Sequence, residues 1–99
     1  MNLLPGTQQY VGDADLAVGT SGHPIRIFSV ECISGGTAST LLLFNGTAIV
    51  AGNRFAQVDG IANQSVLVNY AGGKLFPAGC FLQTDANSAY VTVVYTEEL

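Results

Sequence analysis

Apolar residues recur at every second position in several short runs of this chain, and glycine-containing segments separate the runs. A period of two is typical of β-strands, whereas an amphipathic helix needs apolar residues three and four positions apart. The last run is the clearest, because strict alternation places Val91, Val93 and Tyr95 on one face of a sheet. No long helical period competes with this pattern. We therefore expect an all-β fold.

Seven or eight short antiparallel strands separated by turns predict a single-domain β-sandwich or jelly roll. The whole chain, 1–99, is expected to form this one domain, with 1–22 as a less regular arm and first strands and 23–96 as the core strands. Residues 1–7 are interpreted as an arm. The predicted strands are 8–11, 16–18, 25–33, 40–44, 54–58, 66–70, 80–83 and 90–96.

Strict alternation gives the run 25–33 two largely apolar faces, as in a strand that is covered on both sides. These faces are Arg26, Phe28, Val30 and Cys32 on one side, and Ile25, Ile27 and Ile33 on the other.

Turn signals mark the segments between the predicted strands. Asn45-Gly46 predicts a hairpin, because both residues tolerate a positive φ, and 47–50 could be the partner strand or a bulged continuation. Gly72-Gly73 is expected to close the strand 66–70. Pro77 cannot donate a ladder hydrogen bond, so it is expected at an edge or between strands.

The chain is short of charge. Only 10% of its 99 residues are charged while 48% are hydrophobic, against roughly 25% charged residues in an average soluble domain. A domain of this size buries only about two-thirds of the surface that its unfolded chain exposes. Apolar side chains must therefore reach the surface or pack against another subunit, which points to assembly.

The acidic balance narrows the choice of partner. A net charge of −4 with three cations argues against nucleic acid, because three cations neutralise few phosphates. An anionic membrane surface is disfavoured for the same reason, and no apolar run approaches the roughly 20 residues of a spanning helix. The start of the chain lacks a basic region and a continuous apolar run, so no signal peptide is expected.

Two cysteines, Cys32 and Cys80, lie 48 positions apart without a CxxC spacing. A disulfide is possible on count alone. Without a secretory signal, the chain is expected to stay in a cytosol, where thiols stay reduced. Two free, mostly buried thiols are therefore the favoured interpretation, since buried cysteine behaves as a small hydrophobe.

The residues that could act in catalysis or metal binding do not form a recognisable motif. His23 is the only histidine, and a general base needs a nucleophile and an orienting partner. Asp13 and Asp15 could offer oxygens to a cation, but the remaining ligands of a calcium loop are missing. Asp85 and Asn87 are what a strand-connecting turn selects.

Other motifs are also better explained as turns. Two glycosylation sequons, at 45–47 and 63–65, fall on turn residues, and the glycine pair in 34–37 lacks the lysine and helix of a phosphate loop. Exposed aromatic residues could stack on a sugar, although most are expected in the core or an interface. We predict no enzyme, no cofactor, and no catalytic or metal-binding residue; binding residues are not assigned.

Two segments nevertheless resemble small virion proteins of tailed bacteriophages and cyanophages, particularly capsid decoration (cement) proteins. The first is the strand 25–30 followed by Ser34-Gly35-Gly36-Thr37. The second runs from Leu75 through Pro77 and Cys80 to Phe81, then an Asx-rich turn and the strand 90–95. The resemblance covers about residues 24–96 and carries no diagnostic motif. The acidic end, Glu97-Glu98, has no place in this pattern.

The resemblance implies a homotrimer on the exterior of an icosahedral head, with itself and the major capsid protein as partners. It implies a virion protein, synthesised in the host cytoplasm, that stabilises the head through many weak, repeated contacts. The alternative is a receptor- or glycan-binding module of a phage fibre or tail, which requires exposed Tyr or Phe beside Asn, Asp or Gln in a groove. A small cupin-like enzyme is a third class, but its chemistry needs clustered histidines.

Overall fold

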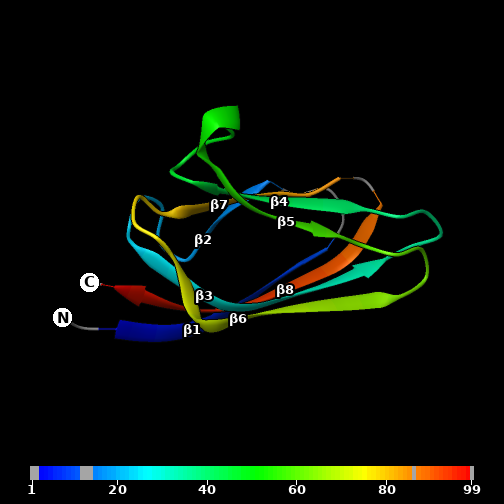
Figure 1. Cartoon of the computed structure of the whole chain (residues 1–99), viewed down its shortest axis with the longest axis horizontal. Coiled ribbons are helices and arrows are strands. Elements are labelled where there is room, and N and C mark those ends of the chain that lie inside the picture. Colours follow the sequence, from blue (N-terminus) through cyan, green and yellow to red (C-terminus); the bar gives the residue numbers. More distant parts are fainter. Residues whose placement is uncertain (1–2, 12–14, 86, 99) are drawn as a thin grey trace.

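Two four-stranded antiparallel sheets pack face to face in the computed structural model, which describes residues 3–11, 15–85 and 87–98 (Figure 1). The first sheet has the order β1-β8-β3-β6 and the second the order β2-β7-β4-β5. This interleaved order is that of a jelly roll, so the predicted sandwich fold is confirmed. The elements are β1 (Leu3–Val11), β2 (Leu16–Val18), β3 (Ile25–Ser34), β4 (Thr40–Asn45), the 3-10 turn η1 (Ala51–Asn53), β5 (Arg54–Asp59), β6 (Ser65–Phe76), β7 (Cys80–Gln83) and β8 (Ser88–Glu98).

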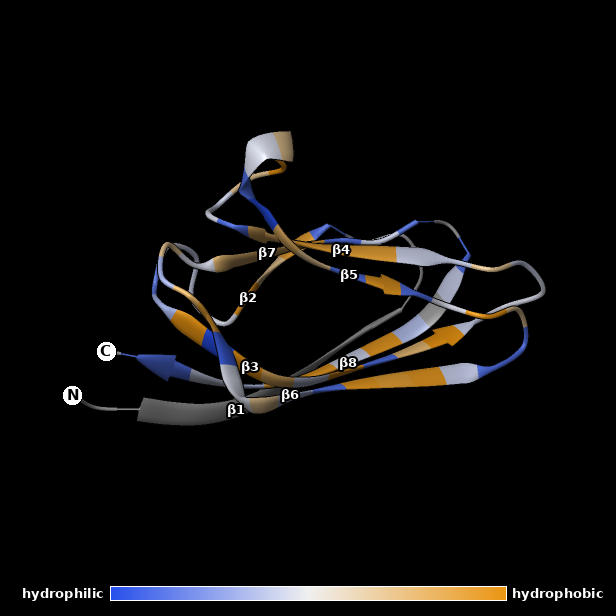
Figure 2. Ribbon diagram, viewed as in Figure 1, coloured by the Kyte–Doolittle hydropathy of each residue, from blue (hydrophilic) through white to orange (hydrophobic). Residues whose placement is uncertain are grey.

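The core lies between the sheets and is built from the inward residues of both. Figure 2 shows the apolar segments along the facing strands. Each fully buried Val, Leu, Ile or Phe contributes roughly 1.5–3 kcal/mol relative to leaving it exposed, so this layer is the main source of stability. Its buried members are Val18, Ile25, Ile27, Val30, Cys32, Leu41, Leu43, Val58, Phe76, Cys80, Leu82, Val91 and Val93.

A bulge in β3 decides which of its side chains enter this core. Ile27 is opposite Tyr95 of β8, but the next paired residue, Ser29, is opposite Val94. Phe28 is therefore an extra residue, and the pairing of β3 with β6 shifts at the same point. A bulge of this kind moves every later residue to the other face of the strand.

The consequence is that Ile25, Ile27, Val30 and Cys32 all point inward and are buried. The expectation of a strand with two apolar faces was wrong, because strict alternation does not survive an inserted residue. The outer face of β3 carries mainly polar side chains after the bulge, and Ile33 is its one aliphatic member there.

Strand β6 does not end at Gly72-Gly73 as expected. Both glycines have a positive φ, +75° and +84°, which lets the chain loop out of the ladder and rejoin it. Pairing with β3 resumes at Lys74 and continues to Phe76. Pro77 then lies in the turn between β6 and β7, where its missing N–H costs no ladder bond.

The prediction of a hairpin at Asn45-Gly46 was also wrong. Residues 46–50 form no strand, and β5 begins only after η1. Asn45 Oδ1 instead accepts a hydrogen bond from the Ala78 backbone N–H at 2.8 Å, and the Gly46 N–H donates to the Gly79 carbonyl at 2.9 Å. These bonds tie the end of β4 to the β6–β7 turn, so a longer loop is needed to reach β5.

The predicted arm is a strand over its described residues. Strand β1 starts at Leu3 and pairs with β8 along its whole length, with Pro5 opposite Thr96. β1 is an edge strand, where a proline is tolerated because one side of the ladder is unpaired. Residues 3–7 have no local pattern that predicts a strand. They are a strand because they pair with β8, which is distant in the sequence.

Glycine at position 73 is expected to be required by the fold. A Cβ there would lie 2.5 Å from Arg26 Cγ, and the φ is unfavourable for other residues. Gly73→Ala should lower the free energy of unfolding by about 1–3 kcal/mol, measured by urea denaturation.

Gly72→Ala is the matched control, because Gly72 has a similar φ but open space around a Cβ. It should cost only the backbone strain, about 1–2 kcal/mol. Gly36→Ala, at a position with open space and no positive φ, should have almost no effect. Equal losses for Gly73→Ala and Gly36→Ala would contradict the bulge geometry.

Candidate functional site

The candidate chemical residues do not gather into a centre. In the ranges that the structure describes, no group of three or more His, Cys, Asp or Glu side chains is placed to hold a metal ion. His23 lies in the β2–β3 loop, and its Nδ1 is 3.6 Å from Glu97 Oε2. The His23 side chain is 46% exposed, so this is a contact at the surface of the loop.

Glu97 has a structural role that the sequence did not reveal. Its side chain is buried, and it accepts hydrogen bonds from the Thr20 backbone N–H at 2.6 Å and from Thr20 Oγ1 at 2.9 Å. The Thr20 backbone bond is the largest influence that lowers the pKa of Glu97, and the nearby His23 lowers it further. Glu97 therefore fixes the β2–β3 loop to the end of β8.

The neighbouring Glu98 completes this attachment. Its backbone N–H donates to the Pro24 carbonyl at 3.0 Å, and its Oε1 lies 3.8 Å from Arg26 Nη2. The two side chains are partly buried, and an ion pair of this length adds little stability by itself. Glu97 and Glu98, which had no place in the sequence pattern, thus attach the end of β8 to the β2–β3 loop and the start of β3. We call the contacts of the Glu97 side chain the Glu97 clamp.

Both cysteines are buried free thiols. Cys32 is in β3 and its Sγ lies 3.3 Å from Ser39 Oγ, which in turn lies 2.6 Å from Ser34 Oγ. Cys80 begins β7, and burial raises its pKa to about 12. A thiol with so high a pKa is almost entirely protonated at neutral pH and is a poor nucleophile.

The acidic residues considered as cation ligands are occupied by backbone groups. Asp85 Oδ2 accepts the Thr40 N–H at 2.8 Å and Oδ1 accepts the Asn87 N–H at 3.0 Å, which confirms the turn interpretation. Asp15 Oδ1 accepts the Thr84 N–H at 3.3 Å. Asp13 lies outside the described residues.

The sequon and glycine segments are also turns. Asn63 adopts a φ of +58°, and its N–H donates to the Gly35 carbonyl at 2.7 Å. The Gly35 N–H in turn donates to the Asn87 carbonyl at 3.0 Å. The glycine-rich 34–37 segment therefore joins two other loops at one end of the sandwich.

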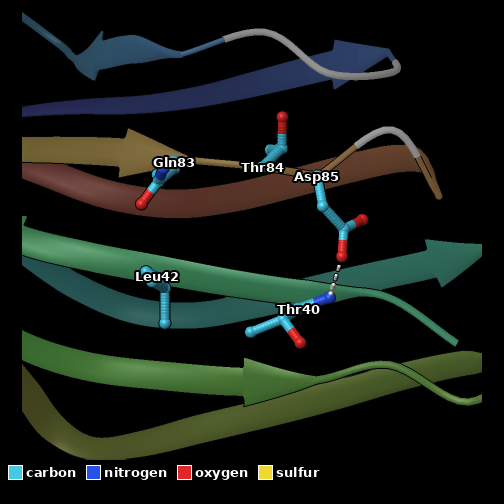
Figure 3. Close-up of a pocket in the computed structure, with 5 residues that line it drawn as sticks. All are labelled: Thr40, Leu42, Gln83, Thr84 and Asp85. Carbon is cyan, nitrogen blue, oxygen red and sulfur yellow. Dashed lines mark hydrogen bonds between the residues drawn. The ribbon is translucent and has the colours of Figure 1, made fainter. Parts of the chain in front are cut away.

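A hollow of about 170 Å³ lies on the outer face of the second sheet. Figure 3 shows the Asp85 carboxylate directed at the Thr40 N–H on its rim. This volume is below the roughly 300–1,000 Å³ of small-molecule pockets. No aromatic side chain lines it, so it does not supply the stacking surface that the glycan-binding alternative requires. The lining residues are Thr40, Leu42, Gln83, Thr84 and Asp85.

The outer face of the first sheet carries exposed apolar side chains. Leu67 of β6, Tyr90 and Val94 of β8 are 56%, 45% and 40% exposed. Ile33 lies between them on β3, opposite Tyr90 in the register. Alternation places all four on the side of the sheet away from the core. We call these four residues the first-sheet face.

The sequence could not locate this face. The assignment of Val94 to the side opposite Val91 and Val93 was correct, and burial confirms it. Leu67, however, looks like any other apolar residue of its strand. Its outward direction follows only from its neighbours Val66 and Val68, which pack against the core.

No protein-family model and no curated protein matches the sequence. Among solved structures, a chain from Bacillus endospore appendages, described as a novel family of disulfide-linked pili, is similar in fold, with a TM-score of 0.52. The two chains are 11% identical over 97% of this chain and 84% of that one. This likeness supports the β-sandwich fold. The described residues contain no helix long and apolar enough to cross a membrane.

The Glu97 clamp predicts a pH-dependent stability. Because the folded state lowers the pKa of Glu97, its charge stabilises the fold above the ordinary value near 4.5. That contribution is lost as the pH falls through the lowered value in the folded state. Glu97→Gln should lower the free energy of unfolding at pH 7 by about 1 kcal/mol, and the difference should shrink in acid. Denaturation series at several pH values test this.

Glu98→Gln is the control for this prediction, because it removes a charge from the adjacent position but leaves the backbone hydrogen bond to Pro24 in place. It should cost less than about 0.5 kcal/mol at pH 7. A larger loss for Glu98→Gln than for Glu97→Gln would contradict the clamp.

The buried thiols predict low reactivity in the folded state. With an aromatic disulfide reagent at pH 8, the native protein should react at least about 100-fold more slowly than the urea-unfolded chain, because burial limits access and, for Cys80, suppresses the thiolate. The release of reagent chromophore measures both rates. Rapid reaction of one thiol in the native state would show that its strand opens readily.

Proposed function

We propose that this chain is a structural protein that assembles with copies of itself and binds a larger protein surface, and that it acts as a bacteriophage capsid decoration protein. The observation that carries this proposal is the first-sheet face. A monomer gains nothing from displaying Leu67 on one side of β3 and Tyr90 and Val94 on the other, all on one outer face, and exposed apolar side chains on a shared face are typical of protein interfaces.

The mixture of apolar and polar side chains on the first-sheet face favours a weak contact that is repeated many times. Apolar and polar side chains are mixed on this face, since Glu31 of β3 is opposite Thr92 of β8 on one side and opposite Leu67 of β6 on the other. Ser65 Oγ donates to Glu31 Oε2 at 2.9 Å, so the carboxylate is already partnered within the sheet. A mixed face of this kind resembles non-obligate interfaces. Many such contacts on one particle add up through avidity.

The sequence resemblance to decoration proteins supports the particular form of the proposal: an oligomer, three copies by that resemblance, on the outside of a head.

A second candidate function is that of a filament subunit, and the buried thiols bear on it. The Bacillus appendage protein is described as forming disulfide-linked pili, and the shared fold favours this candidate. Both cysteines of this chain are buried, however. A filament built from it would need contacts other than disulfides from these two thiols.

The test is binding to expanded phage heads that lack their decoration protein, measured by co-sedimentation. The native protein should bind, and heads that carry it should withstand heating better than bare heads. The double variant Leu67→Gln/Val94→Gln should weaken binding at least about tenfold while it leaves the melting temperature nearly unchanged, because exposed side chains contribute little to folding.

Leu16→Gln is the matched control, because Leu16 is 41% exposed but lies on the second sheet. It should bind like the native protein. A native protein that is monomeric and has no affinity for expanded heads would refute the proposal. Binding to a glycan array with no binding to heads would favour the receptor-binding alternative instead.

A further inference from the structure

The two ends of the outer face of the second sheet differ in shape. At one end, the loop 46–53 rises away from the sheet, as Figure 1 shows for η1. At the other end lies the hollow beside Thr40. Strands β4 and β5 connect the two, since Arg54 is opposite Phe44 and Asp59 is opposite Thr40. Both features therefore sit on the same face, at opposite ends of the same strand pair.

The raised end is apolar and basic. Ile49 and Val50 are 43% and 49% exposed on the loop. Arg54 follows directly and is exposed, and its guanidinium takes part in no ion pair among the described residues. We call Ile49, Val50 and Arg54 the knob.

The knob is held in place rather than loose. Phe44 is on the outer side of β4, yet it is only 2% exposed at the base of the loop. The Gly46 N–H donates to the Gly79 carbonyl, and the Asn53 N–H donates to the Val50 carbonyl at 2.8 Å. A preformed knob loses little entropy on binding.

The hollow end is acidic. Asp59 of β5 and Asp85 after β7 stand on either side of Thr40 in β4. Asp59 is exposed, and its Oδ1 accepts one bond from Gln57 Nε2 at 2.8 Å. Five residues of strand place Asp59 about 17 Å from Arg54 along β5. The two charges therefore cannot pair within one chain.

We propose that the second-sheet face binds the same face of a second copy around a two-fold axis. The inference rests on the part of the proposed function in which copies of the chain assemble with one another. It specifies their contact as a two-fold pair, in place of the three copies that the resemblance implies. The axis lies between the two faces and perpendicular to the strands. It brings the knob of each copy over the hollow of the other, and Arg54 of one copy over Asp59 of its partner. Two identical contacts form at once, as in any isologous interface.

Charge and shape both favour this occupant. A like-with-like arrangement would oppose Arg54 to Arg54 and Asp59 to Asp59, which is repulsive, so the complementary orientation is selected. The hollow holds about 170 Å³, which suits one large side chain such as Ile49 better than a separate small molecule. The first-sheet face is left on the outside of the pair, available to a larger surface.

Reversal of each charge tests the contact. Sedimentation velocity over a concentration series should show the native protein as a dimer, weakened by added salt. Arg54→Glu and Asp59→Arg should each dissociate at least about tenfold more readily. An equimolar mixture of the two variants should associate again, because each then meets an opposite charge. Rescue by mixing cannot come from an effect within one chain.

Glu31→Arg is the matched control, since it makes the same charge change as Asp59→Arg on β3 of the other sheet. It should leave the dimer intact. A native monomer or trimer, dissociation by Glu31→Arg, or failure of the mixture to associate would overturn the inference. Loss of head binding by Arg54→Glu with self-association unchanged would overturn it as well, because the face would then meet the shell.

The head-binding assay separates this inference from the proposed function. Head binding depends on the first-sheet face, so a native protein that binds heads but forms no two-fold dimer would refute only the inference. A dimer that responds to the charge reversals but has no affinity for heads would support the inference and refute the decoration role.

Discussion

The register shift at Phe28 is the constraint on which both faces of the first sheet depend. β3 is paired on both sides, with β8 and with β6, and both ladders shift at the same point. The shift gathers Ile25, Ile27, Val30 and Cys32 in the core. Without it, Val30 and Cys32 would face solvent, and Ser29 and Glu31 would be buried between the sheets, where a carboxylate is costly.

Much of the fold could be predicted from local pattern. The strand 80–83 was located to the residue, and the strands 40–44 and 54–58 each extend one residue further, because alternation and turn residues are local signals. The bulge could not be predicted. It needs Gly72 and Gly73 of β6 opposite Phe28 of β3, and such a match between distant segments is visible only once the pairing is known. The first part of β1, residues 3–7, was missed for the same reason, whereas its second part, 8–11, was predicted.

The candidate interfaces, too, could be predicted from the sequence only in part. The low charge content correctly indicated that apolar side chains reach the surface, as the exposed Leu67 and Val50 show. Which of them share a face depends on topology, so neither the first-sheet face nor the knob could be located. Glu97 was missed because its partner Thr20 lies 77 positions away. In contrast, Asp85 and Asn63 were correctly interpreted as turn residues from sequence alone.

The pairing of Leu3 with Glu98 has a mechanical consequence. Because β1 and β8 are antiparallel, the two chain ends leave from the same end of the first sheet (Figure 1). Tension applied to these ends would peel β1 from β8 one pair of hydrogen bonds at a time, instead of shearing the whole ladder together. The molecule is therefore weak when it is pulled by its termini. Load applied through the sheet faces is instead resisted by both ladders and the core together.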